Sequence, residues 1–277
     1  MRYSTWMTIE NSPRAMGLYR RFRRLPPSLR TAVRWISMPR WEIATAVVHA
    51  RAKDRVLSGP FKGMMLNLSA LSRRNLLGYL LGSQEAELKD VVETIARRPY
   101  TRIINVGAAD GYYAVGLLRR MPNTRVVAFE AIPEHHAGIE RTAMLNGVWS
   151  RIALRGLCRQ EDLSVELDSS AGVPLVVMDI EGGEMELLDP AKTQQLATSD
   201  ILVETHDVFV PGCTEELERR FAATHSIERI VARQRTLTDF PRDMLPSLAA
   251  YAPGLAVEMM NERRVGTQSW LFMTARQ

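Results

Sequence analysis

The 277-residue sequence predicts an α/β chain built on a doubly wound, mostly parallel sheet. Short apolar runs alternate along the chain with segments of helical spacing, as in parallel sheets whose strands are joined by helices. Several of these runs end in glycine or in an acidic residue. Since the carboxyl ends of the strands form the ligand edge of such sheets, the same pattern predicts a ligand site there.

The composition is that of a globular protein, with 46% hydrophobic and 24% charged residues. The net charge of +5 is uneven, because residues 1–55 hold twelve Lys and Arg against three acids and so carry +9, which leaves −4 for the rest. This indicates a local basic arm rather than a general affinity for nucleic acid. Two cysteines are too few for a disulfide framework, and no apolar run of about 18 residues predicts a membrane span. We therefore expect a cytoplasmic protein, peripheral to a membrane if the arm binds one.

Three regions are expected along the chain. Residues 1–56 mix arginines with apolar residues and prolines, which predicts short basic helices. The favoured interpretation is a cap that packs its apolar side on the main domain; a surface for a membrane, a partner protein or RNA is the alternative. Residues 57–100 are expected to form a hairpin and two helices, Leu71 to Leu81 and Glu85 to Ala96, before the core at 101–277.

The core opens with a strand at 103–106, a glycine turn at 107–111, a helix at 112–121 and a second strand that ends in Glu130. An acid about 20 residues beyond a glycine turn can accept hydrogen bonds from ribose hydroxyls, so a nucleoside site is predicted. The turn also contains Asp110, which would repel a pyrophosphate. It suits a ligand with a cationic end, a description that fits S-adenosylmethionine and disfavours a NAD-dependent dehydrogenase.

The remaining elements follow from the same patterns. A helix is expected at 133–146, marked by Pro133 at its start, and another at 215–223. Strands are expected at 152–157, 163–167, 175–178, 201–203, 227–232 and 270–274. Residues 234–268 hold three prolines and read as a long structureless segment; because such segments are usually functional, we expect a substrate lid.

Polar residues follow two of the expected core strands. Asp179 and Glu181 come after the strand at 175–178, and Glu204 and His206 come after the strand at 201–203. Each has an ordinary structural explanation, such as capping a helix or serving as a satisfied histidine. Together with Glu130 and the glycine turn they favour one ligand site at the carboxyl edge of the sheet.

Four segments carry a family resemblance: VGAADGYYAVGL, VVAFEAIPEHHAGIERTAMLNG, VVMDIEGGEMELL and ILVETHD. They resemble the S-adenosylmethionine-dependent methyltransferases of the FkbM type, over about residues 80–233. The resemblance implies a class I, seven-stranded Rossmann-like methyltransferase sheet, here with an N-terminal helical extension. This chain departs from the family pattern at Asn105, where many methyltransferases have an acid, at Ala109, which replaces an asparagine, and at Ala131, which replaces a proline.

The resemblance also implies a cofactor site. Gly107 and Gly111 would let the methionine part of S-adenosyl-L-methionine approach the backbone, Asp110 would hold its charged end, and Glu130 would accept both ribose hydroxyls. Asp179 would face the sulfonium and the acceptor. For Glu85 the spacing favours capping of its own helix over contact with the ligand. The expected cofactor-binding set is Glu85, Asn105, Gly107, Ala108, Asp110, Gly111, Glu130, Ala131, Ile132 and Asp179.

The expected reaction is O-methylation of a sugar or another small hydroxylated metabolite. The acceptor must lose a proton, and His206 is the first candidate for the base, oriented by Glu204 or Asp207. Asp179 and Glu181 are the next candidates, and the expected catalytic set is His206, Asp179 and Glu204. Mg²⁺ held by Asp179, Glu204 and His206 is an alternative, but carboxylates that bind the acceptor or cofactor directly are favoured.

Two other functions stay open at this point. An RNA methyltransferase would use the basic arm, although no aromatic base-stacking motif supports it and nucleic acid is not the favoured partner. A cofactor-binding module without catalysis would use the arm to recruit a membrane or a partner protein. Four arginines could bind an acidic acceptor: Arg233, Arg235, Arg263 and Arg264. Surface arginines without a partner are, however, the commoner case.

Overall fold

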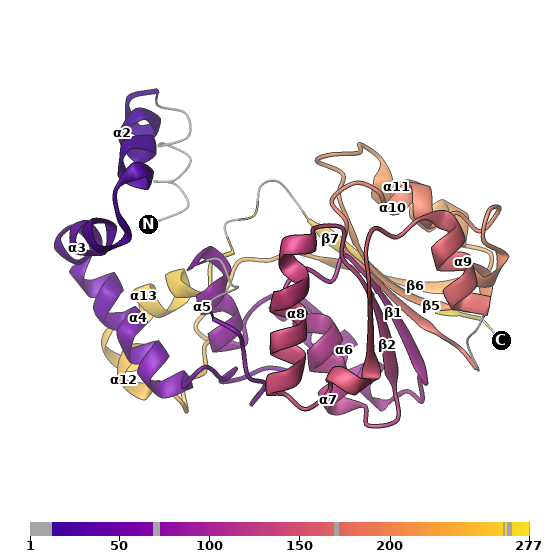
Figure 1. Ribbon diagram of the computed structural model, residues 1–277, viewed down its shortest axis with the longest axis horizontal. Helices are drawn as coiled ribbons and strands as arrows, with labels where there is room; N and C mark the ends of the chain where they lie inside the picture. Colours follow the sequence, from indigo (N-terminus) through magenta and orange to yellow (C-terminus); the bar gives the residue numbers. More distant parts are fainter. Residues whose placement is uncertain (1–12, 69–72, 169–171, 263, 265–267, 277) are drawn as a thin grey trace.

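The computed structural model describes residues 13–68, 73–168, 172–262, 264 and 268–276. A seven-stranded sheet runs through the described chain in the order β3-β2-β1-β4-β5-β7-β6 (Figure 1). Neighbouring strands are parallel except at β7, which is antiparallel to both β5 and β6. The strands are β1 (Arg102–Val106), β2 (Arg125–Phe129), β3 (Ile152–Arg155), β4 (Leu175–Met178), β5 (Asp200–Thr205), β6 (His225–Val231) and β7 (Ser269–Ala275). The predicted doubly wound, mostly parallel Rossmann-like sheet is confirmed.

Helices cover both faces of this sheet. One face packs against α6 (Lys89–Arg97), α7 (Tyr112–Arg120) and α8 (Pro133–Leu145), and this core also takes in α4 (Pro39–Ala52), α5 (Arg73–Leu81), α12 (Pro246–Tyr251) and α13 (Pro253–Met259). The other face packs against α9 (Gln160–Asp168), α10 (Glu184–Leu187) and α11 (Cys213–Phe221). Ile103 of β1 belongs to the first core and Ile104 to the second, because successive side chains of a strand point to opposite faces. The apolar runs are continuous for this reason.

The strand register places the site residues side by side. Met178 of β4 pairs with Val106 of β1 on one side and with Val203 of β5 on the other. Gly107 and Asp179 directly follow β1 and β4, and Glu204 is the next-to-last residue of β5, so the three lie at one edge of adjacent strands. Sequence-distant polar residues converge here as the strand pattern predicted.

One expected strand is a helix. Residues 163–167 alternate in polarity, but they lie within α9, where Leu163 and Leu167 are buried and Val165 is 63% exposed. Leu163 and Leu167 are four residues apart, so a helix buries both on one face, whereas a strand would have buried Val165 with them.

The segments before β1 differ from expectation in two places. The expected hairpin is a loop whose single antiparallel bridge joins Arg55 to Met65. The expected helix at 85–96 begins later, because Glu85 adopts a left-handed conformation with φ of +47° and a turn of 3-10 helix, η1 (Ala86–Leu88), precedes α6. Of the expected helix at 71–81, residues 71 and 72 lie outside the described residues and α5 accounts for the rest.

The expected structureless segment at 234–268 is largely folded. It contains α12 and α13, and Ala256 and Met259 of α13 are buried in the first core. Arg51 of α4 donates a hydrogen bond from Nε to the carbonyl oxygen of Met244 at 3.1 Å, and α12 and α13 lie beside α4 in Figure 1. A lid within this segment stays a prediction, and residues 263 and 265–267 lie outside the described part.

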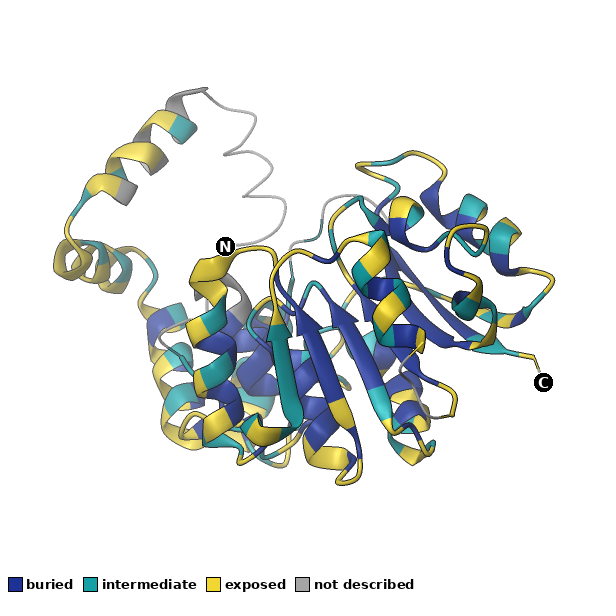
Figure 2. Ribbon diagram, turned by 45° about the vertical axis from the view of Figure 1, so that its right-hand side comes forward, coloured by how far each residue is buried: buried dark blue, intermediate teal, exposed yellow. Residues whose placement is uncertain are grey.

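The N-terminal helices do not all form the expected cap. In α4, Ala44, Val48 and Ala52 are buried against the core. By contrast α3 (Pro27–Ser37) has no buried residue, and α2 (Pro13–Arg24) and α3 stand away from the body of the molecule (Figures 1 and 2). The cap prediction holds for α4 and is wrong for α3. Among the described helices, none is both long and apolar enough to span a bilayer.

Candidate active site

The glycine turn after β1 is shaped by the strand beside it. Gly107 has φ of +82°, and a Cβ built on it would lie 1.8 Å from the carbonyl oxygen of Asp179. Any side chain there would collide with the backbone that leaves β4. Gly111, with φ of +83°, opens α7 where a Cβ would meet Ile139 at 3.4 Å. The first glycine is therefore required by the fold itself, beside its expected role in admitting a ligand.

A pocket lies at the carboxyl edge of β1, β4 and β5. It brings together most of the residues expected there from the sequence: Glu85, Asn105, Gly107, Ala108, Asp110, Asp179 and Glu204. The pocket also has an aromatic wall that was not predicted from the sequence, made of Tyr79, Tyr112, Tyr113 and Trp270. The YY pair directly after the glycine turn was a usable signal, whereas Tyr79 and Trp270 come from segments whose position only the fold reveals. Gly111, Glu130, Ala131 and Ile132 do not line this pocket.

Asn105 lines the pocket and has an unpartnered acceptor. Its Nδ2 donates to the carbonyl oxygen of Val177 at 3.3 Å, which leaves its Oδ1 as the free end of the amide. That oxygen is buried and has no hydrogen-bond partner. An unsatisfied buried acceptor costs about 1–3 kcal/mol, so this atom favours a ligand that brings a donor.

Glu130 supports the glycine turn from the end of β2. Its carboxylate accepts hydrogen bonds from the backbone N–H of Ala109 at 2.7 Å and of Ile132 at 2.9 Å. The side chain is buried, while Ile132 is 48% exposed. Glu130 thus fixes both loops that would border a nucleoside, and its contact with ribose stays a prediction.

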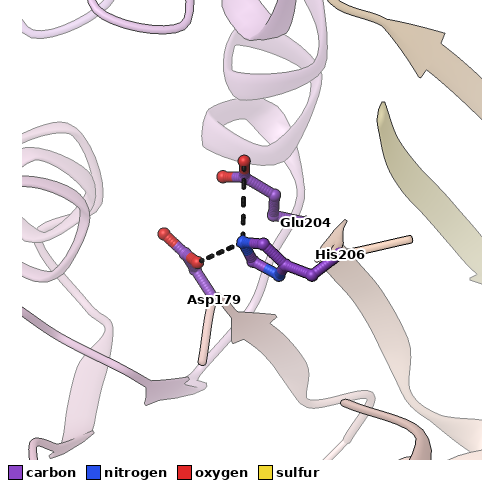
Figure 3. Close-up of side chains that lie close together, drawn as sticks. All are labelled: Asp179, Glu204 and His206. Atoms are coloured by element: carbon purple, nitrogen blue, oxygen red, sulfur yellow. Dashed lines mark ion pairs between the residues drawn. The ribbon is translucent and has the colours of Figure 1, made fainter. Parts of the chain in front are cut away.

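Beside the pocket, His206 faces two carboxylates (Figure 3). Its Nε2 lies 3.6 Å from Oδ1 of Asp179 and 3.9 Å from Oε1 of Glu204. His206 and Glu204 are buried, whereas the Asp179 side chain is 50% exposed. The three expected catalytic residues therefore lie together, with the carboxylates of Asp179 and Glu204 near Nε2 of His206, at the carboxyl ends of β4 and β5.

The other ring nitrogen of His206 is held by Glu184, a residue that was not predicted to belong to the site. Its Nδ1 lies 2.7 Å from Oε1 of Glu184, which is fully buried and also accepts the backbone N–H of Gly182 at 3.0 Å. The expected orienting residues, Glu204 and Asp207, do not fill this role, because Asp207 instead accepts hydrogen bonds from Thr214. Glu184 closes the DIEGGE segment, so its motif position was the available signal.

The hydrogen bond between His206 and Glu184 indicates which ring nitrogen of His206 carries a proton. The hydrogen bond from His206 holds the pKa of Glu184 below its ordinary value despite its burial, so Glu184 is ionised and can only accept. Nδ1 of His206 is therefore the donor, and Nε2 faces the pocket side. Burial lowers the pKa of His206, but the hydrogen bond to Glu184 and the charges of Glu184, Asp179 and Glu204 outweigh it and raise the pKa.

Four acidic side chains that line the pocket have a raised pKa: Glu85, Asp110, Asp179 and Glu204. Burial, with the neighbouring charges of Glu85 and Asp179, raises the pKa of Glu204 to about 8. Burial also raises the pKa of Glu85 to about 7 and that of Asp110 to about 6. A cationic ligand would stabilise the ionised forms of these side chains.

Arg264 already provides one positive charge. It donates from Nη1 to Oε1 of Glu204 at 3.0 Å, pairs with Glu85 at 3.4 Å, and stacks over Trp270 with Cζ 4.6 Å from the ring centroid. Glu85 also accepts a hydrogen bond from Tyr113. Its side chain makes no capping hydrogen bond, so the expectation that Glu85 caps its own helix was wrong.

The arginines expected to meet an acidic acceptor are mostly engaged within the chain. Arg233 pairs with Asp239 at 2.6 Å, Arg235 with Glu87 at 2.6 Å, and Arg264 as described. Arg263 lies outside the described residues. An acidic acceptor would have to compete with these internal carboxylates.

Asp179, Glu204 and His206 could together hold a metal ion. Each offers one ligand atom, and these atoms lie within 4.8 Å of one another. One imidazole and two carboxylates suit Mn²⁺ or Zn²⁺ better than Mg²⁺. An ion would compete with Arg264 for Glu204, so direct use of the carboxylates stays the preferred prediction.

The protein resembles known proteins in its three-dimensional structure but not detectably in its sequence. No protein-family model matches the sequence, and no curated protein is significantly similar to it. Among similar solved structures is a precorrin-6y C5,15-methyltransferase from Geobacter metallireducens, at 14% identity over 77% of this chain and 97% of that one, with a TM-score of 0.47. The O-methyltransferase TomG from Streptomyces achromogenes, in complex with SAM, is 16% identical over 69% of this chain and 80% of its own, with a TM-score of 0.44. A SAM-dependent methyltransferase from Geobacter sulfurreducens, in complex with S-adenosyl-L-homocysteine, is also 16% identical, over 69% of this chain and 91% of its own, with a TM-score of 0.42. At such identities the site has to be judged from this chain's own residues.

Proposed function

We propose that this protein is an S-adenosylmethionine-dependent methyltransferase that acts on a hydroxyl group of a sugar or another small metabolite. The observation that carries the proposal is the convergence of the glycine turn, Asp179, Glu204 and His206 at one edge of a doubly wound sheet, around a pocket rich in carboxylates. This edge is where open α/β sheets bind ligands.

The residues of the pocket fit this cofactor. The free Oδ1 of Asn105 can accept a hydrogen bond from the cofactor's amino group, and Asp110 and Glu85 are acids that a cation would stabilise. When bound, the cofactor supplies a methyl group on a positively charged sulfur. The turn at Gly107 to Gly111 offers no phosphate-binding pattern, since Asp110 stands within it.

The cluster around His206 can activate the acceptor. In its neutral form His206 has a lone pair on Nε2, which takes the acceptor's hydroxyl proton while Nδ1 stays bonded to Glu184. Asp179 and Glu204 flank that nitrogen and can orient further hydroxyl groups of the acceptor by accepting their hydrogen bonds. The protein's main contribution is then to hold the acceptor in line with the methyl group.

Calorimetric titration tests the cofactor. We expect S-adenosylmethionine and S-adenosylhomocysteine to bind the wild-type protein and NAD to give no heat. Asn105→Leu should weaken binding of S-adenosylmethionine about tenfold or more, because the acceptor in the pocket is lost. Its unfolding free energy should change by less than about 1 kcal/mol, since the unpartnered oxygen is lost together with one hydrogen bond.

Asn146→Leu is the matched control. Asn146 lies outside the pocket and makes three hydrogen bonds with Met65 and Thr142, so this variant should lose stability and keep its affinity. An absence of binding at millimolar S-adenosylmethionine would end the methyltransferase proposal. Equal affinity in wild type and Asn105→Leu would remove Asn105 from the site.

A further inference from the structure

Helix α3 presents apolar side chains that no described part of the chain covers. Leu29, Val33 and Ile36 are 52%, 41% and 83% exposed, and the helix has no buried residue. Their spacing of four and three residues puts them on one face. A folded chain rarely leaves such a row in water without a partner.

The same region is strongly basic. Between residues 13 and 41 the sequence has eight arginines and no acidic residue. On α2 the side chains of Arg20, Arg21 and Arg24 are exposed. On α3, Arg30 and Arg34 lie about 100–140° around the helix from the row of Leu29, Val33 and Ile36. The row of Leu29, Val33 and Ile36 and the two arginines of α3 therefore lie on different faces of the helix.

The position of α2 and α3 leaves them accessible. They project from the body of the molecule, to which α4 joins them (Figures 1 and 2). The link is firm, because Glu42 of α4 is buried and pairs with Arg34 of α3 at 3.4 Å, and Ala44 and Val48 are packed in the core. A flat surface could therefore contact both helices.

We propose that α2 and α3 bind the surface of an anionic lipid membrane. The arginines would contact lipid phosphates, while Leu29, Val33 and Ile36 would enter the boundary between headgroups and acyl chains. Nucleic acid would leave the aliphatic row without a use. A second copy docked through these helices would bring seven arginines against seven arginines, and neither helix contains an acidic residue. This inference is independent of the methyl-transfer reaction.

Vesicle flotation with the full chain tests the proposal. The protein should float with vesicles of phosphatidylglycerol and phosphatidylcholine in about equal parts, and stay in solution with phosphatidylcholine alone. The double variant Val33→Asp, Ile36→Asp should lower the bound fraction about tenfold or more, because acids replace two of the three apolar residues that would enter the membrane. Val165→Asp, which changes a 63% exposed valine on the distant helix α9, should float like the wild type.

Further experiments distinguish a membrane from RNA or a second copy of the chain as the partner. Replacing Arg20, Arg21 and Arg24 by glutamine should weaken vesicle binding and its dependence on salt. Tight binding of a labelled single-stranded RNA without vesicle binding, or a stable dimer that Ile36→Asp dissociates, would overturn the membrane proposal. So would vesicle binding that the double variant leaves unchanged.

Discussion

At the scale of single residues, the chemistry of the site depends on how His206 is held. Glu184 and His206 form a buried pair with a 2.7 Å hydrogen bond, so the ring cannot turn without leaving a buried carboxylate unpaired. Such a loss costs several kcal/mol, about 3–5 for a buried charged pair. Glu184 is thus a positioning residue, because it acts through His206 and does not line the pocket.

We expect Glu184→Gln to change the rate and the pH profile in separable ways. Loss of the charge of Glu184 lowers the pKa of His206, which is raised in the wild type, so the rise of kcat/KM with pH should move to lower pH. The maximal rate should fall about 10- to 100-fold, because the ring is held less well. The measurement is a methyl-transfer pH profile with an identified acceptor, with and without EDTA.

Glu186→Gln is the control for this experiment, since Glu186 lies on the same short helix and is exposed. It should behave like the wild type. A Glu184→Gln profile that keeps the wild-type midpoint would show that His206 is not the titrating base. Loss of activity in EDTA would instead favour a metal ion at Asp179, Glu204 and His206.

At the scale of elements, the glycine turn contains a residue with an unfavourable backbone. Ala109 has φ of +49°, a conformation that asparagine and glycine adopt more easily than alanine. Its backbone N–H bonds Glu130, which holds it there. This position is also where the sequence departs from the FkbM pattern of asparagine.

Ala109→Asn should therefore stabilise the protein, by a few tenths to about 1 kcal/mol in the free energy of unfolding measured with urea. The same substitution at an exposed position of α4, Ala50→Asn, should destabilise it by about 0.5 kcal/mol, because asparagine is the poorer helix former. Equal effects at the two positions would mean that the strain at Ala109 is relieved in solution.

At the scale of the whole molecule, the buried acids of the pocket connect stability to pH. Folding raises the pKa of Glu85 to about 7 and of Glu204 to about 8, from 4.5 for each when unfolded. Between these values the folded chain binds more protons than the unfolded chain, so stability falls as pH rises. Ligand cations should bind more tightly over the same range as the acids ionise.

We expect the unfolding free energy of the ligand-free protein to decrease between about pH 5 and pH 8, by at most about 1.4 kcal/mol per pH unit for each proton. Glu204→Gln should flatten the upper part of this slope. Glu93→Gln, at an acid paired with Arg120 far from the pocket, should leave it unchanged. Urea denaturation at a series of pH values measures all three, and a stability that rises with pH would contradict the pKa shifts of the pocket.

Much of the fold could be predicted from the local spacing of apolar and polar residues in the sequence. The continuous apolar runs of β1 and β4 predicted buried parallel strands, and the polar residues at their ends predicted which side chains meet. The strand predicted at 163–167 was wrong, because the apolar residues there fit both patterns. They alternate with polar residues as in a strand, and Leu163 and Leu167 are four residues apart as on one face of a helix. Glu184 was overlooked as a partner of His206, because their 22-residue separation carries no local signal.

The sequence by itself determined the alternation of strands and helices, the turn at Gly107 to Gly111 and the acids that follow the strands, because these depend on the spacing of apolar residues and on backbone preference. Only the tertiary structure decided that Glu184 holds His206, that Arg264 donates a hydrogen bond to Glu204, and that no described part of the chain covers the apolar row of α3. Those outcomes depend on which distant segments become neighbours and on how much water is excluded between them, and neither quantity can be read from residue order.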